Sequence, residues 1–431
     1  MATPLSRLAA LERFGMKLGL ETMRSLSELA GSPERACPAL HVAGTNGKGS
    51  VAAMLAAALR AGGFRVGLYS SPHLVELGER FQIDGTPTPA EALEPLAAWA
   101  LALDDTAQRH EGRAHPATFF EITTLMAFEQ FRREGVTAAV IETGLGGRFD
   151  ATNIVSPRVA VITSIALDHT RQLGRSLVSI AREKAGIIKP DVPVVAGPLP
   201  PTALRAVREA ATRAGAPLVE ALEDTAVELS VTRDGQNLLT LGTPHRTYGP
   251  LRLGLRGRHQ AVNAAIAVRA LETAGDGGLS VAADAIERGL RTVRWPGRLD
   301  LVRLGGRSLL LDGAHNAAGA EALARYLDEI HPDGVSLVFG CSADKDARAM
   351  LDILARRARR VICTEALSAR AAKASALARI AATLGVDVPI DAVPDPAAAT
   401  RAALASPEVV CVAGSLFLIG DVARELGLRL W

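Results

Sequence analysis

The sequence predicts an α/β protein with two domains, the first built on a parallel sheet and the second a smaller, Rossmann-like α/β domain. Apolar runs alternate with helical patterns through the first two-thirds of the chain, and a second alternating stretch begins after Pro296. Strand, helix and strand in this order form parallel βαβ units. A chain of 431 residues also favours two domains, or three, over one.

The first stretch contains segments whose type follows from their apolar pattern. Strands are expected where short apolar runs are bounded by glycine or polar residues, and helices where apolar residues recur with a period of 3.6. The expected strands are residues 38–43, 64–69, 138–142 and 159–165, and the expected helices are residues 50–61 and 118–133. Residues 218–255 have shorter strands, more charge and an Asp234-Gly235 turn, so we expect an antiparallel appendage there.

The second stretch predicts four further strands with helices between them. These strands are residues 308–311, 335–339, 360–364 and 409–413. The Pro296-Gly297 pair before them has the composition of a hinge. We therefore expect a first domain of residues 1–296 and a second domain of residues 297–431.

Composition excludes several classes of protein. Apolar residues make up 48% of the chain and charged residues 22%, which suits a globular protein and excludes a disordered one. The 48 basic and 46 acidic residues give a net charge of +2, so no broad field is available to hold nucleic acid or an anionic membrane. No apolar run reaches 18 residues, and no signal-peptide core is present near the start.

The spacing of the cysteines indicates the redox conditions in which the protein works. No two of them form a C-x-x-C pair, so neither a disulfide framework nor a zinc knuckle is expected; they are Cys37, Cys341, Cys363 and Cys411. Cysteines of this kind suit a reducing environment. We therefore expect a cytoplasmic protein with no nucleic-acid partner and no membrane partner.

A glycine-rich loop, H-V-A-G-T-N-G-K-G-S at residues 41–50, joins the first expected strand to the first expected helix. Backbone N–H groups and a helix N-terminus in that setting cradle phosphate. Lys48 can reach the outer phosphates, and Ser50 is placed for a metal or a phosphate, although a glycine separates the two where the general P-loop has none. The alternative is a glycine turn with a chance lysine. The expected nucleotide-binding residues here are Gly44, Thr45, Asn46, Gly47, Lys48, Gly49 and Ser50.

Six motifs follow one another in an order that resembles the folylpolyglutamate synthase/dihydrofolate synthase family. They are G-T-N-G-K-G-S at 44–50, S-S-P-H-L at 70–74, E-T-G-L-G-G-R-F-D-A-T-N at 142–153, L-D-H at 167–169, E-K-A-G-I-I-K at 183–189 and D-G-A-H-N at 312–316. The family belongs to the Mur-type ATP-dependent amide ligases, and the resemblance runs from about Lys17-Leu18 to Ser415. It implies a P-loop ATPase domain followed by a glutamate-ligase domain, with ATP and L-glutamate as substrates.

The chemistry of such a ligase explains why this set of motifs is needed. A carboxylate does not react with an amine at neutral pH, because oxide is a poor leaving group. Transfer of the γ-phosphoryl group of ATP makes an acyl phosphate, from which phosphate leaves easily. The site must therefore neutralise phosphates, align one carboxylate and exclude water from the intermediate. The resemblance gives Lys48, Lys184 and His315 as the expected catalytic residues.

Two magnesium ions are expected, partly from the residues and partly from the resemblance. Glu142 ends an apolar strand in the crevice position where α/β enzymes bind ligands, and its carboxylate suits Mg²⁺. A lone histidine such as His169 is more often structural, but the resemblance implies that Ser71, Glu142 and His169 bind metal. It also implies that Lys184 is carbamylated and helps to hold a second ion; the alternative is a solvated surface lysine.

The resemblance also supplies the remaining expected site residues. They are Asn263, Arg298 and Asp312 for the nucleotide, Thr118, Phe120, Asp150 and Ala151 for the folate, and His315 and Ser415 for glutamate. Phe120 can stack on a flat pterin, while core packing is the usual role of a phenylalanine in a helix. For Arg298 alone, a surface role would be the default.

The pterin-side segments resemble those of bacterial members that carry both activities. We therefore expect a monomer that joins glutamate to dihydropteroate, giving dihydrofolate, and also lengthens the tail of reduced folates. A folylpolyglutamate synthase alone would share every ATP-site motif and remains an alternative. A cell-wall Mur ligase would need an added N-terminal domain, for which little room precedes Gly44. The other motif residues would have no role in a P-loop kinase, a GTPase or a non-catalytic nucleotide-binding module.

Overall fold

The computed structural model describes residues 3–14, 19–112 and 115–431, so Lys17 and Leu18 of the resemblance lie outside the described residues. Its main sheet has eight strands in the order β4-β3-β2-β5-β1-β6-β7-β8. The strands are β1 (Ala39–Ala43), β2 (Val66–Tyr69), β3 (Phe81–Ile83), β4 (Thr86–Pro87), β5 (Ala138–Glu142), β6 (Val159–Ile162), β7 (Val194–Ala196) and β8 (Leu218–Glu220). All pairings are parallel except those of the edge strands β3 and β4, so the predicted parallel sheet is confirmed.

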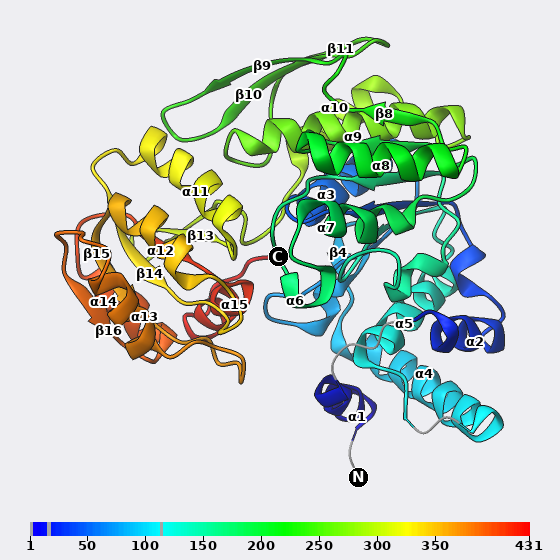
Figure 1. The fold of residues 1–431 in the computed structure, drawn as a ribbon, viewed down its shortest axis with the longest axis horizontal. Helices are drawn as coiled ribbons and strands as arrows, with labels where there is room; N and C mark the ends of the chain where they lie inside the picture. The colour runs from blue at the N-terminus through cyan, green and yellow to red at the C-terminus, as the bar shows by residue number, and fades with distance from the viewer. Residues whose placement is uncertain (1–2, 15–18, 113–114) are drawn as a thin grey trace.

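Helices cover both faces of this sheet (Figure 1). Leu40 and Val42 of β1 pack in one hydrophobic cluster, whereas Ala39 and Ala43 face the other side, as the period of 2 in a strand requires. The first face packs against α3 (Lys48–Ala61), α9 (His259–Asp276) and α10 (Ala283–Thr292). The second packs against α1 (Pro4–Ala9), α2 (Glu21–Leu29), α4 (Ala90–Glu111), α5 (Phe119–Arg133), α7 (Leu177–Lys184) and α8 (Pro201–Arg213).

A separate antiparallel sheet lies over α9 and α10, at the top of Figure 1. It consists of β9 (Ala226–Val231), β10 (Asn237–Gly242) and β11 (Thr247–Arg252), and Leu239, Tyr248 and Leu251 bury its inner face. The predicted antiparallel appendage is thus confirmed for these strands. It is wrong for residues 218–220, because β8 pairs in parallel with β7 and extends the main sheet.

The third sheet lies wholly after Gly297 in sequence. Its strand order is β12-β13-β17-β14-β15-β16, from β12 (Asp300–Leu304), β13 (Arg307–Asp312), β14 (Val335–Phe339), β15 (Ala358–Cys363), β16 (Ile390–Ala392) and β17 (Val410–Ala413). Only β12 is antiparallel to its neighbour. On one face lie α11 (Ala317–Ile330), α12 (Ala347–Leu354) and α13 (Ala374–Ala382), and on the other α14 (Pro396–Leu404) and α15 (Leu416–Glu425).

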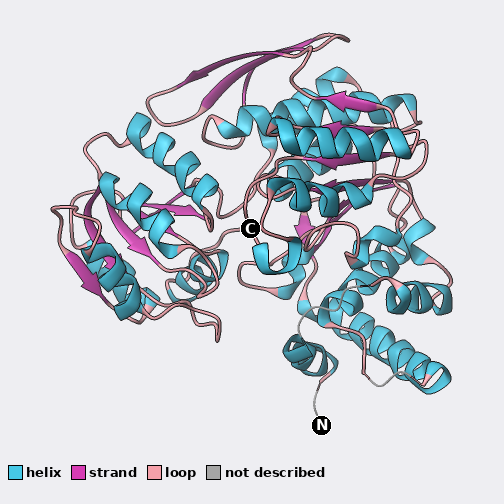
Figure 2. Cartoon of the chain, in the orientation of Figure 1, coloured by secondary structure: helices cyan, strands magenta, loops and turns pink. Residues whose placement is uncertain are grey.

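The two sheet-and-helix bodies stand side by side, and the C-terminus of the chain lies between them (Figure 2). The loop after β2 bridges the two bodies: Leu74 packs in the core of the second one, and Arg424 of α15 donates to the carbonyl oxygen of Val75 at 3.2 Å. Among the described residues, no helix is long and apolar enough to cross a membrane. The geometry therefore places the carboxyl edge of the first sheet against the second body.

Candidate active site

Three neighbouring strands of the main sheet, β5, β1 and β6, end at the same edge. Gly44 follows β1, Glu142 is the last residue of β5, and the segment from Thr163 to His169 follows β6. Ligands of open α/β sheets bind at this carboxyl edge. Parallel pairing therefore brings three of the predicted motifs together.

The glycine-rich loop is held by the segment after β6. Ser164 accepts a hydrogen bond from the Thr45 amide through its carbonyl oxygen (2.8 Å) and from the Asn46 amide through its hydroxyl (3.0 Å). A Cβ on Gly44 would lie 1.9 Å from Oγ1 of Thr163, so only glycine fits at that position. The loop is thereby fixed with its chain leading into α3, whose first residue is Lys48.

The start of α9 lies against the start of α3. Nε2 of Gln260 donates to Oγ of Ser50 at 3.1 Å, and Nδ2 of Asn263 donates to Oε1 of Gln260 at 2.9 Å. A Cβ on Gly47 would lie 2.7 Å from Oδ1 of Asn263. Two predicted nucleotide residues, Ser50 and Asn263, are therefore joined through Gln260, which sequence reasoning had not assigned a role.

Glu142 is a buried carboxylate, with only 4% of its surface exposed. Burial raises its pKa, while the charges of Lys48 and Arg298 act to lower it. The backbone amide of Ser71 donates to its Oε2 at 3.4 Å, a long hydrogen bond. A buried carboxylate with so little hydrogen bonding is a suitable ligand for a divalent cation.

His169 and Lys184 approach the same edge from different segments. His169 has a left-handed backbone, with φ of 48°, and burial lowers its pKa to about 4, so its imidazole is neutral at pH 7. Lys184 is 4% exposed, and its Nζ donates to the carbonyl oxygen of Gly44 at 2.7 Å. Burial and the charge of Lys48 lower its pKa to about 7. The alternative of a solvated surface lysine is therefore wrong.

Three side chains of the second body contact or approach the carboxylate of Asp168. It forms an ion pair with Lys345, accepts from Nδ2 of Asn316 at 3.1 Å, and lies 3.4 Å from Nε2 of His315. His315 donates through Nδ1 to the carbonyl oxygen of Gly313 at 2.8 Å, which leaves Nε2 facing the carboxylate. The structure thus brings the predicted His315 to the phosphate loop. Lys345 was missed, although it is one of only six lysines in the chain.

Arg298 and Asp312 lie where the chain enters the second body. Asp312 accepts from the amides of Leu299 (2.9 Å) and Ala314 (3.0 Å), so its carboxylate ties the linker to the end of β13. Arg298 is half-buried, and the charges of Asp312 and Glu142 both act on its guanidinium. Arg298 is therefore at the junction of the two bodies, and both residues remain predicted nucleotide ligands.

The four predicted folate residues cluster on the α5 side of the sheet. Thr118 and Glu121 form a capping box at the start of α5, and the Phe120 ring lies against Gly144, with its centroid 6.0 Å from that of Tyr69. Asp150 accepts from the Leu145 amide at 2.7 Å and from the hydroxyl of Thr152 at 2.6 Å, next to the buried Ala151. Thr118 and Asp150 thus have structural roles, and their contact with a pterin stays a prediction.

Ser415 stands at the N-terminus of α15. Its side chain accepts from the amide of Phe417 at 3.2 Å, and 4% of its surface is exposed. This helix is also the one that contacts the loop after Ser71. Its role toward glutamate is a prediction that no contact here tests.

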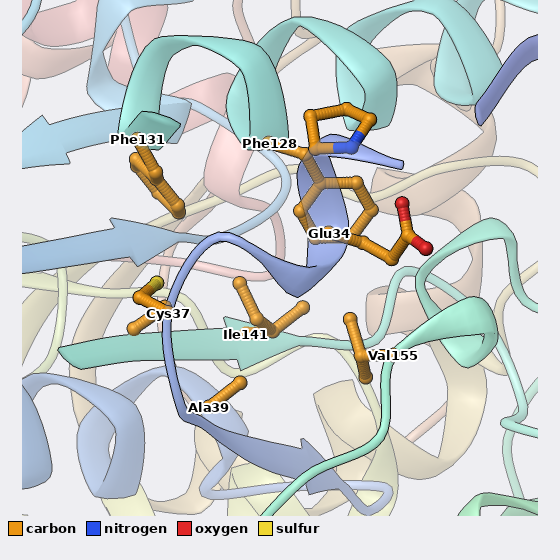
Figure 3. A pocket seen from close by; sticks show the side chains of 9 residues that line it. Glu34, Cys37, Ala39, Phe128, Phe131, Ile141 and Val155 are labelled. Carbon is orange, nitrogen blue, oxygen red and sulfur yellow. The ribbon is translucent and has the colours of Figure 1, made fainter. Parts of the chain in front are cut away.

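A small apolar cavity lies at the opposite end of the sheet, beside the starts of β1 and β5 (Figure 3). Cys37, Phe128, Ile141 and Val155 line it, together with Glu34. Burial raises the pKa of the Cys37 thiol to about 11, so the group is neither a ready nucleophile nor a metal ligand at pH 7. The chemistry therefore belongs to the carboxyl edge.

Comparison with known proteins places this architecture. Residues 42–271 match the Mur ligase middle domain, and residues 297–416 match the Mur ligase glutamate ligase domain. The chain is 35% identical to the dihydrofolate synthase/folylpolyglutamate synthase of Bacillus subtilis over 427 residues, which covers 96% of each chain.

Two solved structures are also similar over almost the whole chain. A Mycobacterium tuberculosis folylpolyglutamate synthase complexed with ADP has a TM-score of 0.90 and 32% identity, covering 99% of this chain and all of that one. Escherichia coli FolC in complex with DHPP and ADP has a TM-score of 0.86 and 32% identity, covering 99% of this chain and 98% of that one.

Proposed function

This chain belongs to the Mur ligase family, in its dihydrofolate synthase/folylpolyglutamate synthase branch, and we propose that its residues join L-glutamate to dihydropteroate and to reduced folates through an acyl phosphate. It is an ATP-dependent ligase of folate metabolism. The observation that carries the mechanism is the meeting of Lys48, Glu142 and Lys184 from the first body with Arg298 and His315 from the second. A cation-rich site closed from two sides suits the transfer of a phosphoryl group and the protection of its product from water.

The roles of the residues follow from what each one faces. Lys48, at the start of α3, neutralises the β- and γ-phosphates, with the backbone of the glycine-rich loop around them. The carboxylate of the acceptor attacks the γ-phosphorus, ADP leaves, and the amine of glutamate then displaces phosphate from the acyl phosphate and loses a proton. Arg298 and His315 add positive charge and a hydrogen-bond donor from the other side of the cleft.

Of the predicted metal ligands, Glu142 and Ser71 are arranged in a way that suits Mg²⁺. Glu142 is buried with a single long hydrogen bond, and Ser71 lies beside it. Among the described residues no three His, Cys, Asp or Glu side chains form a metal-binding group, so a cation at Glu142 needs serine, phosphate or water oxygens as well. When bound, Mg²⁺ would neutralise phosphate charge. We propose Ser71, Glu142 and His169 as its protein ligands, and Lys184 for a second ion.

Lys184 has the properties that carbamylation needs. An amine reacts with CO₂ in its neutral form, and a pKa of about 7 leaves much of Lys184 neutral in the cell. A carbamate is an anion whose oxygens suit a hard cation, whereas an ammonium would repel it. In a crystal structure with Mg²⁺ and ADP, we expect extended density at Lys184, and activity that rises with added bicarbonate. A plain amine there, with two ions bound, would refute the carbamate.

The substrates occupy the two sides of this cleft. Phe120, with Thr118, Asp150 and Ala151, would hold the pterin, because the ring lies beside Gly144 in the loop that follows Glu142. The second body would bind the incoming glutamate near His315 and Ser415. We place the enzyme in the cytoplasm, because its free cysteines, three of them buried, require no oxidising compartment. We further propose that it acts as a monomer.

The decisive assay is phosphate release from ATP with each combination of substrates. We expect turnover when dihydropteroate and L-glutamate are both present, and again when a reduced folate replaces dihydropteroate. Release that needs no glutamate, or that needs a UDP-sugar peptide in place of a folate, would overturn the proposed function. Turnover of reduced folates without turnover of dihydropteroate would leave a folylpolyglutamate synthase alone.

A further inference from the structure

Arg80 is a buried cation that the described ion pairs leave without a carboxylate. Only 8% of its surface is exposed, yet no Asp or Glu oxygen of the described residues lies within ion-pair distance of its guanidinium. Burying an unpaired charge costs several kcal/mol in a protein interior. A chain that retains such a group has a use for its charge, since a neutral side chain would be more stable there.

The surroundings fix the orientation of the side chain. Nε donates to Nδ1 of His73 at 2.9 Å, and the guanidinium lies over the ring of Phe119, 5.1 Å from its centroid. A guanidinium can only donate, so Nδ1 of His73 is the acceptor of this hydrogen bond. Nε thus holds the group in place, and the hydroxyl of Tyr69 is a second polar neighbour of the guanidinium. Neither neighbour is a carboxylate, so the terminal nitrogens can still pair with one.

Backbone pairing places Arg80 at the same edge as the candidate site. Arg80 ends the 3₁₀ turn Leu77–Arg80 just before β3, and its carbonyl oxygen accepts from the amide of Ser70 at 3.1 Å. Ser70 follows β2, which pairs with β5 so that Tyr69 lies opposite Ile141. Glu142 is the next residue of β5, and its charge acts on Arg80. One strand, β2, therefore separates Arg80 from Glu142.

The same position borders the predicted pterin side. Phe119, under the guanidinium, precedes Phe120, whose ring lies 6.0 Å from that of Tyr69. An acceptor with its pterin at Phe120 must bring its carboxylate, which is its reacting end, to the phosphates. Arg80 is a cation that lies over Phe119 and is acted on by the charge of Glu142 at the carboxyl edge.

We propose that the Arg80 guanidinium binds the carboxylate of the folate acceptor, the group that becomes the acyl phosphate. This inference rests on the proposed function. Arg80 transfers no proton in the reaction: it pairs with the two carboxylate oxygens, and one of them attacks the γ-phosphorus as ADP leaves. A planar fork suits this task because it holds a carboxylate in one orientation.

The test compares two ligands and three proteins. Dihydropteroate and its analogue lacking the carboxylate are titrated calorimetrically into the full-length enzyme with Mg²⁺ and ADP. We expect wild type to prefer the carboxylate by about tenfold or more, in line with a charged hydrogen bond. Arg80→Gln should lose that preference and bind the analogue within about threefold of wild type. Arg148→Gln, which removes an exposed arginine after Glu142, should keep the preference.

The outcomes separate this inference from the proposed function. Equal weakening of both ligands by Arg80→Gln, or a wild type with no preference, would overturn the role of Arg80 and leave the ligase intact. A wild type that binds neither compound would overturn both. If Arg80→Gln does not fold, Arg80→Lys decides the matter by kinetics. We then expect the KM for the acceptor to rise about tenfold while the KM for ATP stays within about threefold; an unchanged acceptor KM would contradict the proposal.

Discussion

Burial controls the charges of the residues that approach the phosphate loop. Lys184 donates to the carbonyl oxygen of Gly44 from a position with 4% exposure, so its ammonium form has lost most of its hydration. Desolvation disfavours the charged form, and nearby Lys48 adds repulsion. At pH 7 a large share of the Lys184 amine is therefore neutral, which is the form that can become a carbamate.

The pH dependence of stability tests this state of Lys184. Its pKa is about 7 in the folded chain and about 10.5 when unfolded. Between these values the unfolded chain binds a proton that the folded chain does not, so this group makes stability rise with pH from about 7. Lys184→Met has no titratable group at this position, so its stability lacks this dependence on pH. In CO₂-free buffer, we expect the stability of the variant relative to wild type to be greater at pH 6.5 than at pH 9, by about 2–3 kcal/mol.

Denaturant unfolding of both proteins at the two pH values measures this difference. Activity should be lost in Lys184→Met throughout. A stability difference that does not change between pH 6.5 and pH 9 would show that Lys184 is charged in the folded chain.

Lys48 is expected to act on the phosphates with little effect on folding. Its side chain is half-buried at the first position of α3 and donates only to the carbonyl oxygen of Thr45, at 3.3 Å. Lys48→Ala should lower the rate of phosphate release about 100-fold or more, while stability changes by about 1 kcal/mol or less. Lys373→Ala removes an exposed lysine of the second body and is the matched control. A Lys48 variant with more than about a tenth of wild-type rate would contradict this role.

At the level of elements, the site depends on how helices begin. The glycine-rich loop leads into α3 at Gly47, where φ is 85° and Asn263 leaves no room for a Cβ. Trp295, just before the hinge, lies within 2.6 Å of where a Cβ on Gly49 would be. The loop is therefore confined by α9 and by the linker as well as by the segment after β6, and a substitution at either glycine would displace the phosphate-binding backbone.

The start of α5 gives a test of the structural role of Thr118 as a helix cap. Thr118 caps this helix by accepting from the Glu121 amide at 3.2 Å, while Glu121 accepts from the Thr118 amide at 2.8 Å. Thr118→Ala should destabilise the protein by about 1 kcal/mol, and Thr118→Ser, which keeps the hydroxyl, by a few tenths. Thermal unfolding measures both changes. Equal stability of the two variants would mean that the hydroxyl does not cap α5.

At the scale of the whole molecule, the carboxylate of Asp168 in the first body contacts several side chains of the second body. Lys345, His315 and Asn316 approach its carboxylate from the second body, and Asn316 also exchanges hydrogen bonds with Asn46 of the phosphate loop, at 3.0 and 3.2 Å. Burial acts to raise the pKa of Asp168, but the hydrogen bond with His315 and the charges of His169 and Lys345 hold it well below its usual range. Asp168 contacts both His315 and Asn316, and Asn316 contacts the phosphate loop. The position of His315 is therefore coupled to that of the loop.

A double-mutant cycle tests this connection. Asp168→Asn and Lys345→Met should each lower kcat/KM about tenfold or more, because each leaves a partly buried partner unpaired. The double variant should be little worse than either single one, since both changes remove the same contact. Strictly additive losses would mean that the two residues act separately.

A second contact between the bodies supplies the control for this cycle. Arg258 forms an ion pair with Glu329 at 2.7 Å, but its side chain is 55% exposed. Arg258→Gln should change kcat/KM by no more than about threefold, because exposed ion pairs contribute at most about 1 kcal/mol.

Much of the fold and part of the site could be predicted because their signals are local. Apolar runs located the strands β1, β5, β14 and β17 to within a residue or two, and strand endings placed Glu142 at the carboxyl edge. The helix α4 went unpredicted although its signal is present: Leu93, Leu96, Ala97, Ala100 and Leu101 are buried and recur at helical spacing.

The sequence by itself determined the family of folds, the phosphate loop and the residue types at the carboxyl edge. Only the tertiary structure decided that Lys184 is buried, that Lys345 meets Asp168 across 177 residues of chain, and that Arg80 has no carboxylate partner in the described part of the chain. The physical reason is that periodicity reports which face of an element is apolar, whereas the charge and partners of a polar side chain depend on neighbours from distant segments. Desolvation and ion pairing arise only when the chain has closed around them.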